Sequence, residues 1–405
     1  MSIDLRTRSD GPRNPVAAAD FFTALPDLLA TRADTINPGL AWLSPPPLVI
    51  DVDGATWSLR WNGRAVDVRH GEESNAPRVR LNGEQFDDLI VDQTTFVGLH
   101  ASGRLDLTGG TLADLNDWWL VLRAALDERP IYTPGAIGLR DRDGADLDLR
   151  RAFRPDDDRD AMRRFLAEAG YLHIVGLFSA AEMDQVSADM DRAAPSYAPG
   201  DGRSWWAKTA HGERRLVRMQ GFDRHSPATE ALLDDIRFRS LADISGDGHS
   251  ADGRRGANRI EALFKPIGVV EGISDVPWHK DCGIGRHSYD CCGLTVGISV
   301  TGADAVSGQL RVIAGSHRAL IWPARLREGI DLPQIDLPTR IGDVTLHASC
   351  TMHMAQPPIE RERRVMYTGF PLPPRSAHAA SGQARLRAVR EAAPVTVSQP
   401  PSPVR

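Results

Sequence analysis

A short stretch in the second half of the chain, Pro277-Trp-His-Lys-Asp-Cys-Gly283, brings two metal-binding side chain types close together. Successive residues of a β-strand point to opposite faces, so His279 and Asp281 share a face if the stretch is extended. An imidazole nitrogen and a carboxylate oxygen can then reach one point. Most His-x-Asp pairs bind no metal, so the pair needs a further ligand from elsewhere in the chain.

A second stretch, from Val344 to His353, supplies the histidines His347 and His353. They are six residues apart, so they share a face of one continuous strand but lie about 20 Å apart along it. We therefore expect only one of them to join His279 and Asp281. Two histidines and one carboxylate form the facial triad of non-haem Fe(II) oxygenases, which leaves coordination positions open for O₂ and substrate oxygen atoms.

A third stretch, from Arg361 to Phe370, has the pattern of a strand that carries several arginines. Arg363 and Arg364 are neighbours, so only one of them can face the interior. An inward arginine can bind a carboxylate through two parallel hydrogen bonds. Arg361 and Glu362 fit a solvated charge cluster better.

From about residue 158 to 372, the chain resembles the phytanoyl-CoA dioxygenase family of Fe(II)/2-oxoglutarate oxygenases. The resemblance implies a double-stranded β-helix (jelly-roll) domain with flanking helices. It is carried by motifs that follow one another in the family's order: Glu168-Ala-Gly-Tyr-Leu172, Gly176-Leu-Phe-Ser179, Phe264-Lys-Pro266, Trp278-His-Lys-Asp281, Ser307-Gly-Gln-Leu-Arg-Val-Ile-Ala-Gly-Ser-His-Arg318, Gly342-Asp343, His353 and Arg363.

The resemblance also implies a metal, cosubstrates and a reaction. His279 and Asp281 match the family's first two iron ligands and His353 matches the distal one, which leaves His347 as a buried neighbour. The implied cofactors are Fe(II), 2-oxoglutarate and O₂, and the implied reaction is hydroxylation of a C–H bond. Halogenating relatives lack the carboxylate ligand, so the presence of Asp281 favours hydroxylation.

Arg363 matches the arginine that binds 2-oxoglutarate, and Arg364 is the alternative by one residue. Lys265 and Trp278 are candidates for the cosubstrate pocket, and each is equally plausible as a structural residue. The family often has Gly-Ser after the distal histidine, where this chain has Met354-Ala355, so one hydroxyl contact to the cosubstrate is missing.

An insert containing Trp205 and Trp206 has the composition of a surface loop with two exposed aromatic side chains. Such an insert could form a lid over the substrate. The alternative is that both tryptophans pack locally against the barrel.

The region 16–128 is predicted to be a separate α+β domain in which helices cover a sheet. The segments 79–89 and 103–110 and the helix containing Trp118 and Trp119 resemble the sterol-carrier-protein type of lipid-binding domain. The apolar face of that helix has two interpretations. It covers the sheet, or sheet and helix together enclose a cavity of lipid size.

Composition restricts the partners and the compartment. Lys plus Arg number 48 and Asp plus Glu number 54 in 405 residues, a net charge of −6, which disfavours nucleic acid as a partner. No apolar run approaches the roughly 18 residues of a membrane span, so no stable membrane insertion is expected. Four cysteines are too few for a disulfide scaffold and indicate the cytoplasm. They are Cys282, Cys291, Cys292 and Cys350.

We therefore divide the chain into a domain at 16–128, a linker at 129–157, an oxygenase domain at 158–374 and a flexible tail at 375–405. The predicted substrate is a small molecule, hydrophobic or carrier-linked, such as a lipid, an acyl thioester or a natural product. The alternative function is a non-enzymatic lipid or sterol carrier with an inert barrel. A zinc hydrolase with the same three ligands is disfavoured by Arg363 and the Gly-Ser-His-Arg motif.

Overall fold

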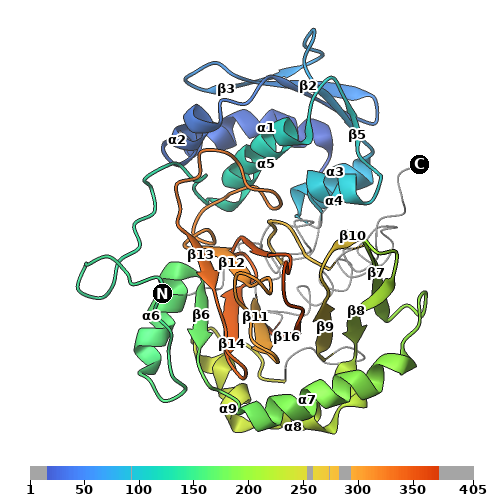
Figure 1. The fold of residues 1–405 in the computed structure, drawn as a ribbon. Helices are drawn as coiled ribbons and strands as arrows, with labels where there is room; N and C mark the ends of the chain where they lie inside the picture. The colour runs from blue at the N-terminus through green and yellow to red at the C-terminus, as the bar shows by residue number, and fades with distance from the viewer. Residues whose placement is uncertain (1–15, 93, 253–258, 273, 282–292, 374–405) are drawn as a thin grey trace.

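The computed structural model of the chain describes residues 16–92, 94–252, 259–272, 274–281 and 293–373 (Figure 1). An N-terminal α/β unit is followed by a unit rich in antiparallel sheet, which confirms the predicted succession at this level. The predicted tail at 375–405 and three of the four cysteines lie outside the described residues. Those cysteines are Cys282, Cys291 and Cys292.

The N-terminal unit is built on a five-stranded sheet with the order β3-β2-β1-β4-β5. β1 and β4 pair in parallel, and the other neighbours pair antiparallel. The strands are β1 (Leu48–Val52), β2 (Ala55–Trp61), β3 (Val66–His70), β4 (Arg78–Leu81) and β5 (Asp106–Thr108). The helices are α1 (Ala18–Thr31), α2 (Ala33–Leu43), α3 (Gly83–Ile90), α4 (Phe96–Ala101) and α5 (Leu112–Asp127).

Alternating residues of β2 turn their apolar side chains toward the helices, where the ring of Phe22 stacks on Trp57 with the centroids 4.7 Å apart. Helix α5 begins at the capping box formed by Thr111 and Asp114. Both Trp118 and Trp119 are buried among the core side chains of this unit. The apolar side chains of α5 are therefore part of this unit's core, where the helix packs against α1, α2 and α4, and lipid binding by this unit stays a prediction.

The C-terminal unit contains two antiparallel sheets. The larger has eight strands in the order β10-β7-β8-β9-β16-β11-β14-β6, and the smaller has the order β13-β12-β15. The strands of the larger sheet are β6 (Tyr171–Ile174), β7 (Ser204–Thr209), β8 (Arg214–Gln220), β9 (Glu261–Lys265), β10 (Val269–Glu271), β11 (Gly293–Ser299), β14 (Val344–Ala348) and β16 (Arg363–Pro371). Those of the smaller sheet are β12 (Leu310–Ile313), β13 (Gln334–Leu337) and β15 (His353–Ala355).

Helices flank these sheets, and α7, α8 and α9 lie together at one side of the larger sheet (Figure 1). The α-helices are α6 (Arg159–Ala169), α7 (Ala180–Ala193), α8 (Pro227–Asp234) and α9 (Ile236–Arg239). Single 3₁₀ turns are η1 (Ala194–Ser196), η2 (Phe222–His225) and η3 (Ser240–Asp243). α6 ends at Gly170, whose φ is 84°, and α7 begins at the capping box of Ser179 and Glu182.

The two faces of the larger sheet differ in chemistry because side chains alternate along each strand. One face is apolar and packs against α7, α8 and α9, with buried side chains that include Leu294, Val296, Met366 and Phe370. The register of the strands places Thr295, His347, Tyr367, Arg363 and Lys265 on the opposite face. We call these five residues the polar face.

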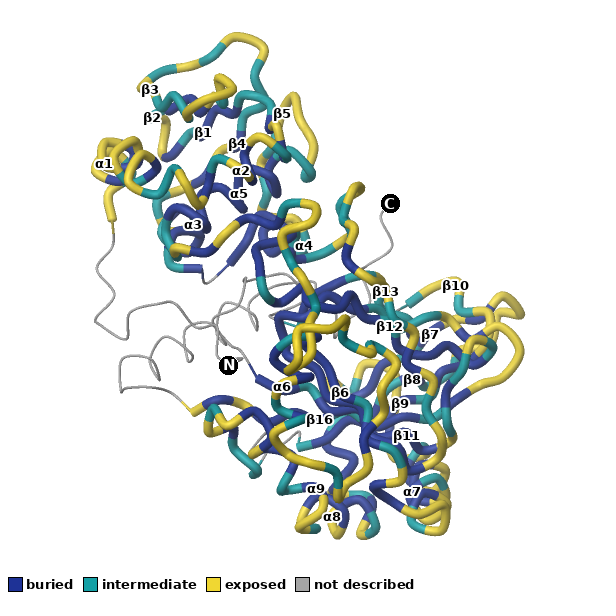
Figure 2. Tube along the Cα trace, turned by 90° about the vertical axis from the view of Figure 1, so that its left-hand side faces the viewer, coloured by how far each residue is buried: buried dark blue, intermediate teal, exposed yellow. Residues whose placement is uncertain are grey.

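The two units pack directly on each other. Figure 2 shows them as two lobes, and many residues are buried where the lobes meet. The core of the N-terminal unit includes Leu320, Cys350 and Leu372 from the C-terminal unit. The segment 129–157 contains no named helix or strand, yet Tyr132 and Phe153 within it are fully buried. None of the helices in the described part of the chain is long and apolar enough to cross a membrane.

The prediction of a surface loop at Trp205 and Trp206 is wrong. Both residues lie on β7, which pairs antiparallel with β8 and so forms part of the larger sheet. Trp205 is buried beneath the guanidinium of Arg218, 3.8 Å from the ring centroid. The chain reverses at Gly212, whose φ of 84° suits a tight turn, and the aromatic residues before it favour a strand.

Gly342 offers a test of this packing. Its φ is 82°, and a Cβ there would overlap the carbonyl oxygen of Phe178. Gly212 has a φ of 84° with open space around it. We expect Gly212→Ala to cost about 1–2 kcal/mol of unfolding free energy from backbone strain alone. Gly342→Ala should cost a further ~1–3 kcal/mol because the neighbouring backbone must move. Urea denaturation measures both, and equal costs would contradict the packing described.

Candidate metal centre

The chain does not run as one strand from Val344 to His353, which corrects the expectation that the two histidines lie about 20 Å apart. β14 ends at Ala348, and a turn stabilised by a 2.8 Å hydrogen bond from the Thr351 amide to the Ala348 carbonyl leads into β15. β14 belongs to the larger sheet and β15 to the smaller. The rings of His347 and His353 therefore face each other, with centroids 4.2 Å apart.

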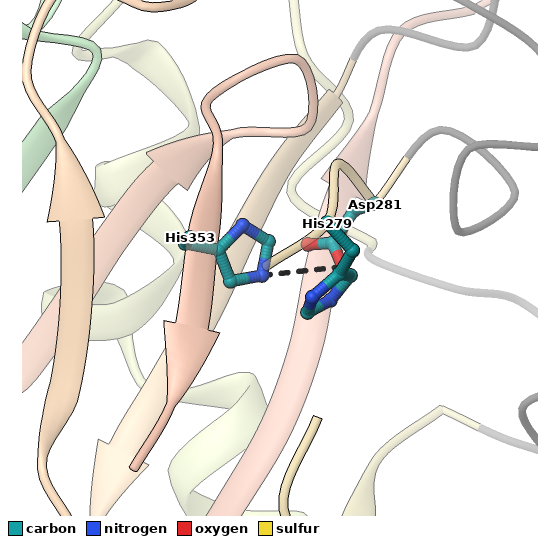
Figure 3. Close-up of side chains that lie close together, drawn as sticks. All are labelled: His279, Asp281 and His353. Carbon is teal, nitrogen blue, oxygen red and sulfur yellow. Dashed lines mark ion pairs between the residues drawn. The ribbon is translucent and has the colours of Figure 1, made fainter. Parts of the chain in front are cut away.

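His279 is placed beside His353 by the backbone. The amide of each residue donates a 3.0 Å hydrogen bond to the carbonyl of the other, so their side chains point in the same direction. The Asp281 amide donates to the Ser349 carbonyl at 2.9 Å. One ligand atom from each of His279, Asp281 and His353 lies within 4.8 Å of the others, and Figure 3 shows the His353 imidazole facing the other two.

Hydrogen bonds fix the tautomers of both histidines. Nδ1 of His279 lies 2.7 Å from the Pro277 carbonyl oxygen, and Nδ1 of His353 lies 2.9 Å from the Thr351 carbonyl oxygen. A carbonyl only accepts, so each Nδ1 carries a proton, and in the neutral ring Nε2 keeps the lone pair that can bind a metal. Both Nε2 atoms lie 3.5 Å from Oδ1 of Asp281. Two lone pairs and a carboxylate oxygen that face one another favour a cation between them.

The pKa shifts of the site residues also favour a cation at this point. Burial alone would raise the pKa of Asp281, but the charge of His353 and hydrogen bonds from three histidines hold it well below its usual range. Burial lowers the pKa of His279, helped by the neighbouring His353. For His353, burial is outweighed by the attraction of Asp281, so the pKa is raised. The carboxylate is therefore ionised and attracts positive charge to this point.

The second oxygen of Asp281 is held by other residues. Oδ2 accepts a 2.6 Å hydrogen bond from the Thr295 hydroxyl and lies 3.0 Å from Nε2 of His347. Burial lowers the pKa of His347 to about 4, so its neutral ring donates from Nε2. With Oδ2 held in this way, Oδ1 faces His279 and His353. As expected, only His353 of the two joins His279 and Asp281 in the group of possible metal ligands. His347 lies close as well, but it bonds to the other oxygen of the carboxylate.

Thr295 was not among the residues expected at the site. It lies opposite His347 in the register of β11 and β14. Sequence periodicity shows which residues of one strand share a face, but it does not show which strands are neighbours. The contact between Thr295 and Asp281 therefore depends on sheet pairing alone.

The structure places Arg363, and not Arg364, on the polar face. Arg363 is 4% exposed, and its Nε and Nη2 atoms are buried without a hydrogen-bond partner among the described residues. Arg364 points to the opposite side, where it forms a 2.7 Å ion pair with Asp191 on α7. A buried guanidinium with two unused donors is a site for an anion.

Lys265 lies directly opposite Arg363 in the pairing of β9 and β16. Its buried ammonium group donates to the Ser274 carbonyl and lies 3.3 Å from Oδ1 of Asp275. Burial lowers the pKa of Lys265 to about 7. Trp278 instead packs in an apolar cluster with Tyr132 and so does not join these cations.

A test of the carboxylate arrangement is Thr295→Val, which keeps the shape of the side chain and removes its hydrogen bond to Asp281. We expect the dissociation constant for Fe(II), measured anaerobically by calorimetry, to rise about tenfold, as for other residues that orient a metal ligand. Thr368→Val is the matched control, because Thr368 is buried and donates to the Arg259 carbonyl away from the site. An unchanged affinity in Thr295→Val would refute the orienting role.

Comparison with known proteins places this site in a family. Residues 166–364 match the family model described as phytanoyl-CoA dioxygenase (PhyH). None of the curated proteins searched matches the chain. The match begins after the N-terminal unit, so the likeness of that unit to sterol carriers stays a prediction.

Solved structures with similar folds include three with low sequence identity. The epimerase SnoN from nogalamycin biosynthesis is 18% identical with a TM-score of 0.42, over 53% of this chain and 80% of that chain. AviO1 from Streptomyces viridochromogenes Tue57 is 19% identical with a TM-score of 0.41, over 53% and 96% of the two chains. EctD from S. alaskensis is 18% identical with a TM-score of 0.42, over 60% and 86%.

The three converging ligand residues all lie inside the matched range. Iron, 2-oxoglutarate and O₂ are the cofactor and cosubstrates of this family, as expected from the sequence. The chain therefore contains a domain of the phytanoyl-CoA dioxygenase family, which comprises iron- and 2-oxoglutarate-dependent oxygenases.

Proposed function

We propose that the chain is a 2-oxoglutarate-dependent dioxygenase that hydroxylates a C–H bond of a small molecule. One observation carries the proposal. The lone pairs of His279 and His353 and Oδ1 of Asp281 converge beside a sheet face on which the buried Arg363 has two unused donors. This donor set fits iron, and the arginine fits the far carboxylate of a keto acid.

His279, Asp281 and His353 would hold the iron. With 2-oxoglutarate and O₂, the iron supplies the oxidation of the substrate C–H bond. The backbone bonds between His279 and His353 keep the two imidazoles side by side, and Thr295 and His347 hold one carboxylate oxygen so that the other can face the metal. We further infer that the two sheets of this unit form a double-stranded β-helix.

Arg363 would bind the distal carboxylate of 2-oxoglutarate through two hydrogen bonds. Lys265 adds positive charge nearby when it is protonated, although Asp275 offsets part of that charge. Because both cations are buried, their attraction for a dianion is screened less than at the surface. Arg364 does not bind the cosubstrate in this proposal, because its guanidinium already donates hydrogen bonds to Asp191 and Ser187 on α7.

The substrate is proposed to be a small molecule, and a lipid or carrier-linked chemistry stays a prediction that rests on the N-terminal unit. Contact of Trp205 or Trp206 with substrate also stays a prediction. The alternative of a carrier protein with an inert barrel is not favoured. An inert barrel gives no reason for two imidazole nitrogens and a carboxylate to converge, or for Arg363 to be buried with two unpaired donors.

Turnover of the cosubstrate tests this function without knowledge of the substrate. Purified protein with Fe(II), ascorbate, 2-oxoglutarate and O₂ should form succinate slowly, as measured by mass spectrometry. Asp281→Asn should reduce succinate to the level of the iron-free protein, because the metal loses its anionic ligand. His211→Gln is the control, since His211 is exposed in the turn between β7 and β8. Failure of the folded wild-type protein to bind Fe(II) would refute the proposal.

The two neighbouring arginines provide a matched pair of variants. Arg363→Gln should weaken 2-oxoglutarate binding to the Fe(II) protein by about 10- to 150-fold, since charge-assisted hydrogen bonds contribute about 1.5–3 kcal/mol. For Arg364→Gln, the dissociation constant for 2-oxoglutarate should stay within about twofold of the wild-type value, because this variant loses only a partly exposed ion pair with Asp191. Anaerobic titration of the visible charge-transfer band measures both constants. A stronger effect at Arg364 would show that the assignment is reversed.

A further inference from the structure

The N-terminal unit touches the segment that positions the metal site. Asp117 on α5 is 7% exposed and accepts a 2.8 Å hydrogen bond from the indole N–H of Trp322 and a 3.3 Å bond from Nε of Arg327. Arg327 also donates to the Leu43 carbonyl at 3.2 Å and lies 4.2 Å from the ring centroid of Trp42. One buried carboxylate therefore ties two residues of the C-terminal unit to the N-terminal unit.

Trp322 and Arg327 enclose a short segment, Pro323 to Arg325, that pairs with the backbone around His279. The Lys280 amide donates to the Pro323 carbonyl at 3.0 Å, and the Arg325 amide donates to the Trp278 carbonyl at 2.9 Å. His279 forms an antiparallel bridge with Ala324 on one side and with His353 on the other. The segment 323–325 thus extends the smaller sheet beyond His279 and lies at its edge.

An edge segment of three residues has few backbone bonds of its own, so its position depends on what holds its ends. Here both ends are held by Asp117. The turn between His347 and His353 also contacts the N-terminal unit, because Cys350 within this turn is buried in the core of that unit. Both segments that present histidines to the metal therefore rest on the N-terminal unit.

We propose that Asp117 is a positioning residue and that the N-terminal unit acts as a brace for the metal site. By holding Trp322 and Arg327, Asp117 fixes the segment 323–325, which in turn fixes the backbone of His279 against His353. The N-terminal unit then contributes to metal affinity although it supplies no ligand. This inference rests on the proposed function, because it requires that His279 binds the metal.

The test uses full-length protein loaded anaerobically with Co(II), whose visible spectrum reports the geometry of its ligands. Asp117→Ala should raise the Co(II) dissociation constant about tenfold, comparable to the loss of other groups that orient metal ligands, and should change the spectrum. Trp322→Phe keeps the aromatic ring and removes the N–H, so it should weaken Co(II) binding by a smaller factor. This second variant serves if Asp117→Ala fails to fold.

Asp331→Asn is the matched control. Asp331 links the C-terminal unit to the segment 129–157, through the Tyr132 hydroxyl and the Gly135 amide at 2.9 Å, but it lies outside the segment paired with His279. The Asp331→Asn protein should bind Co(II) with the wild-type dissociation constant. The inference is overturned if folded Asp117→Ala or Trp322→Phe keeps the wild-type constant and spectrum, or if Asp331→Asn weakens binding equally. A wild-type protein that binds no Co(II) or Fe(II) would instead overturn the proposed function.

Discussion

A carboxylate oxygen that faces two imidazole lone pairs at close range is unstable unless positive charge lies between them, and this constraint organises the metal site of the C-terminal unit. Asp281 receives hydrogen bonds from Thr295 and His347 on one oxygen, while the other faces the Nε2 atoms of His279 and His353. Each of these contacts comes from a different segment of chain. The two sheets must therefore be brought together in one arrangement for the site to exist.

Because side chains alternate along each strand, one face of the larger sheet packs against helices and the other carries polar residues of the proposed site. Its apolar face packs against α7, α8 and α9 and holds the sheet in place. Its polar face is left free to present Thr295, His347, Lys265 and Arg363 toward the smaller sheet. The neighbouring arginines illustrate the division, because Arg364 anchors α7 through Asp191 while Arg363 keeps unused donors on the polar face.

The N-terminal unit gains a physical role from its contacts even though its resemblance to lipid carriers stays a prediction. Its core takes in side chains of the C-terminal unit, and Asp117 reaches the segment beside His279. The segment 129–157, which was expected to be a linker, also contributes Tyr132 and Phe153 to buried clusters.

The sequence by itself determined the family, the ligand residues to consider and the order of the two units, because motif spacing and residue type are local properties of the chain. Only the tertiary structure turned Arg363 and Arg364 to environments on opposite faces, brought His347 to Asp281 and placed Trp205 and Trp206 inside a sheet. These outcomes depend on where a strand breaks and which strands become neighbours, and both are fixed by packing between distant segments.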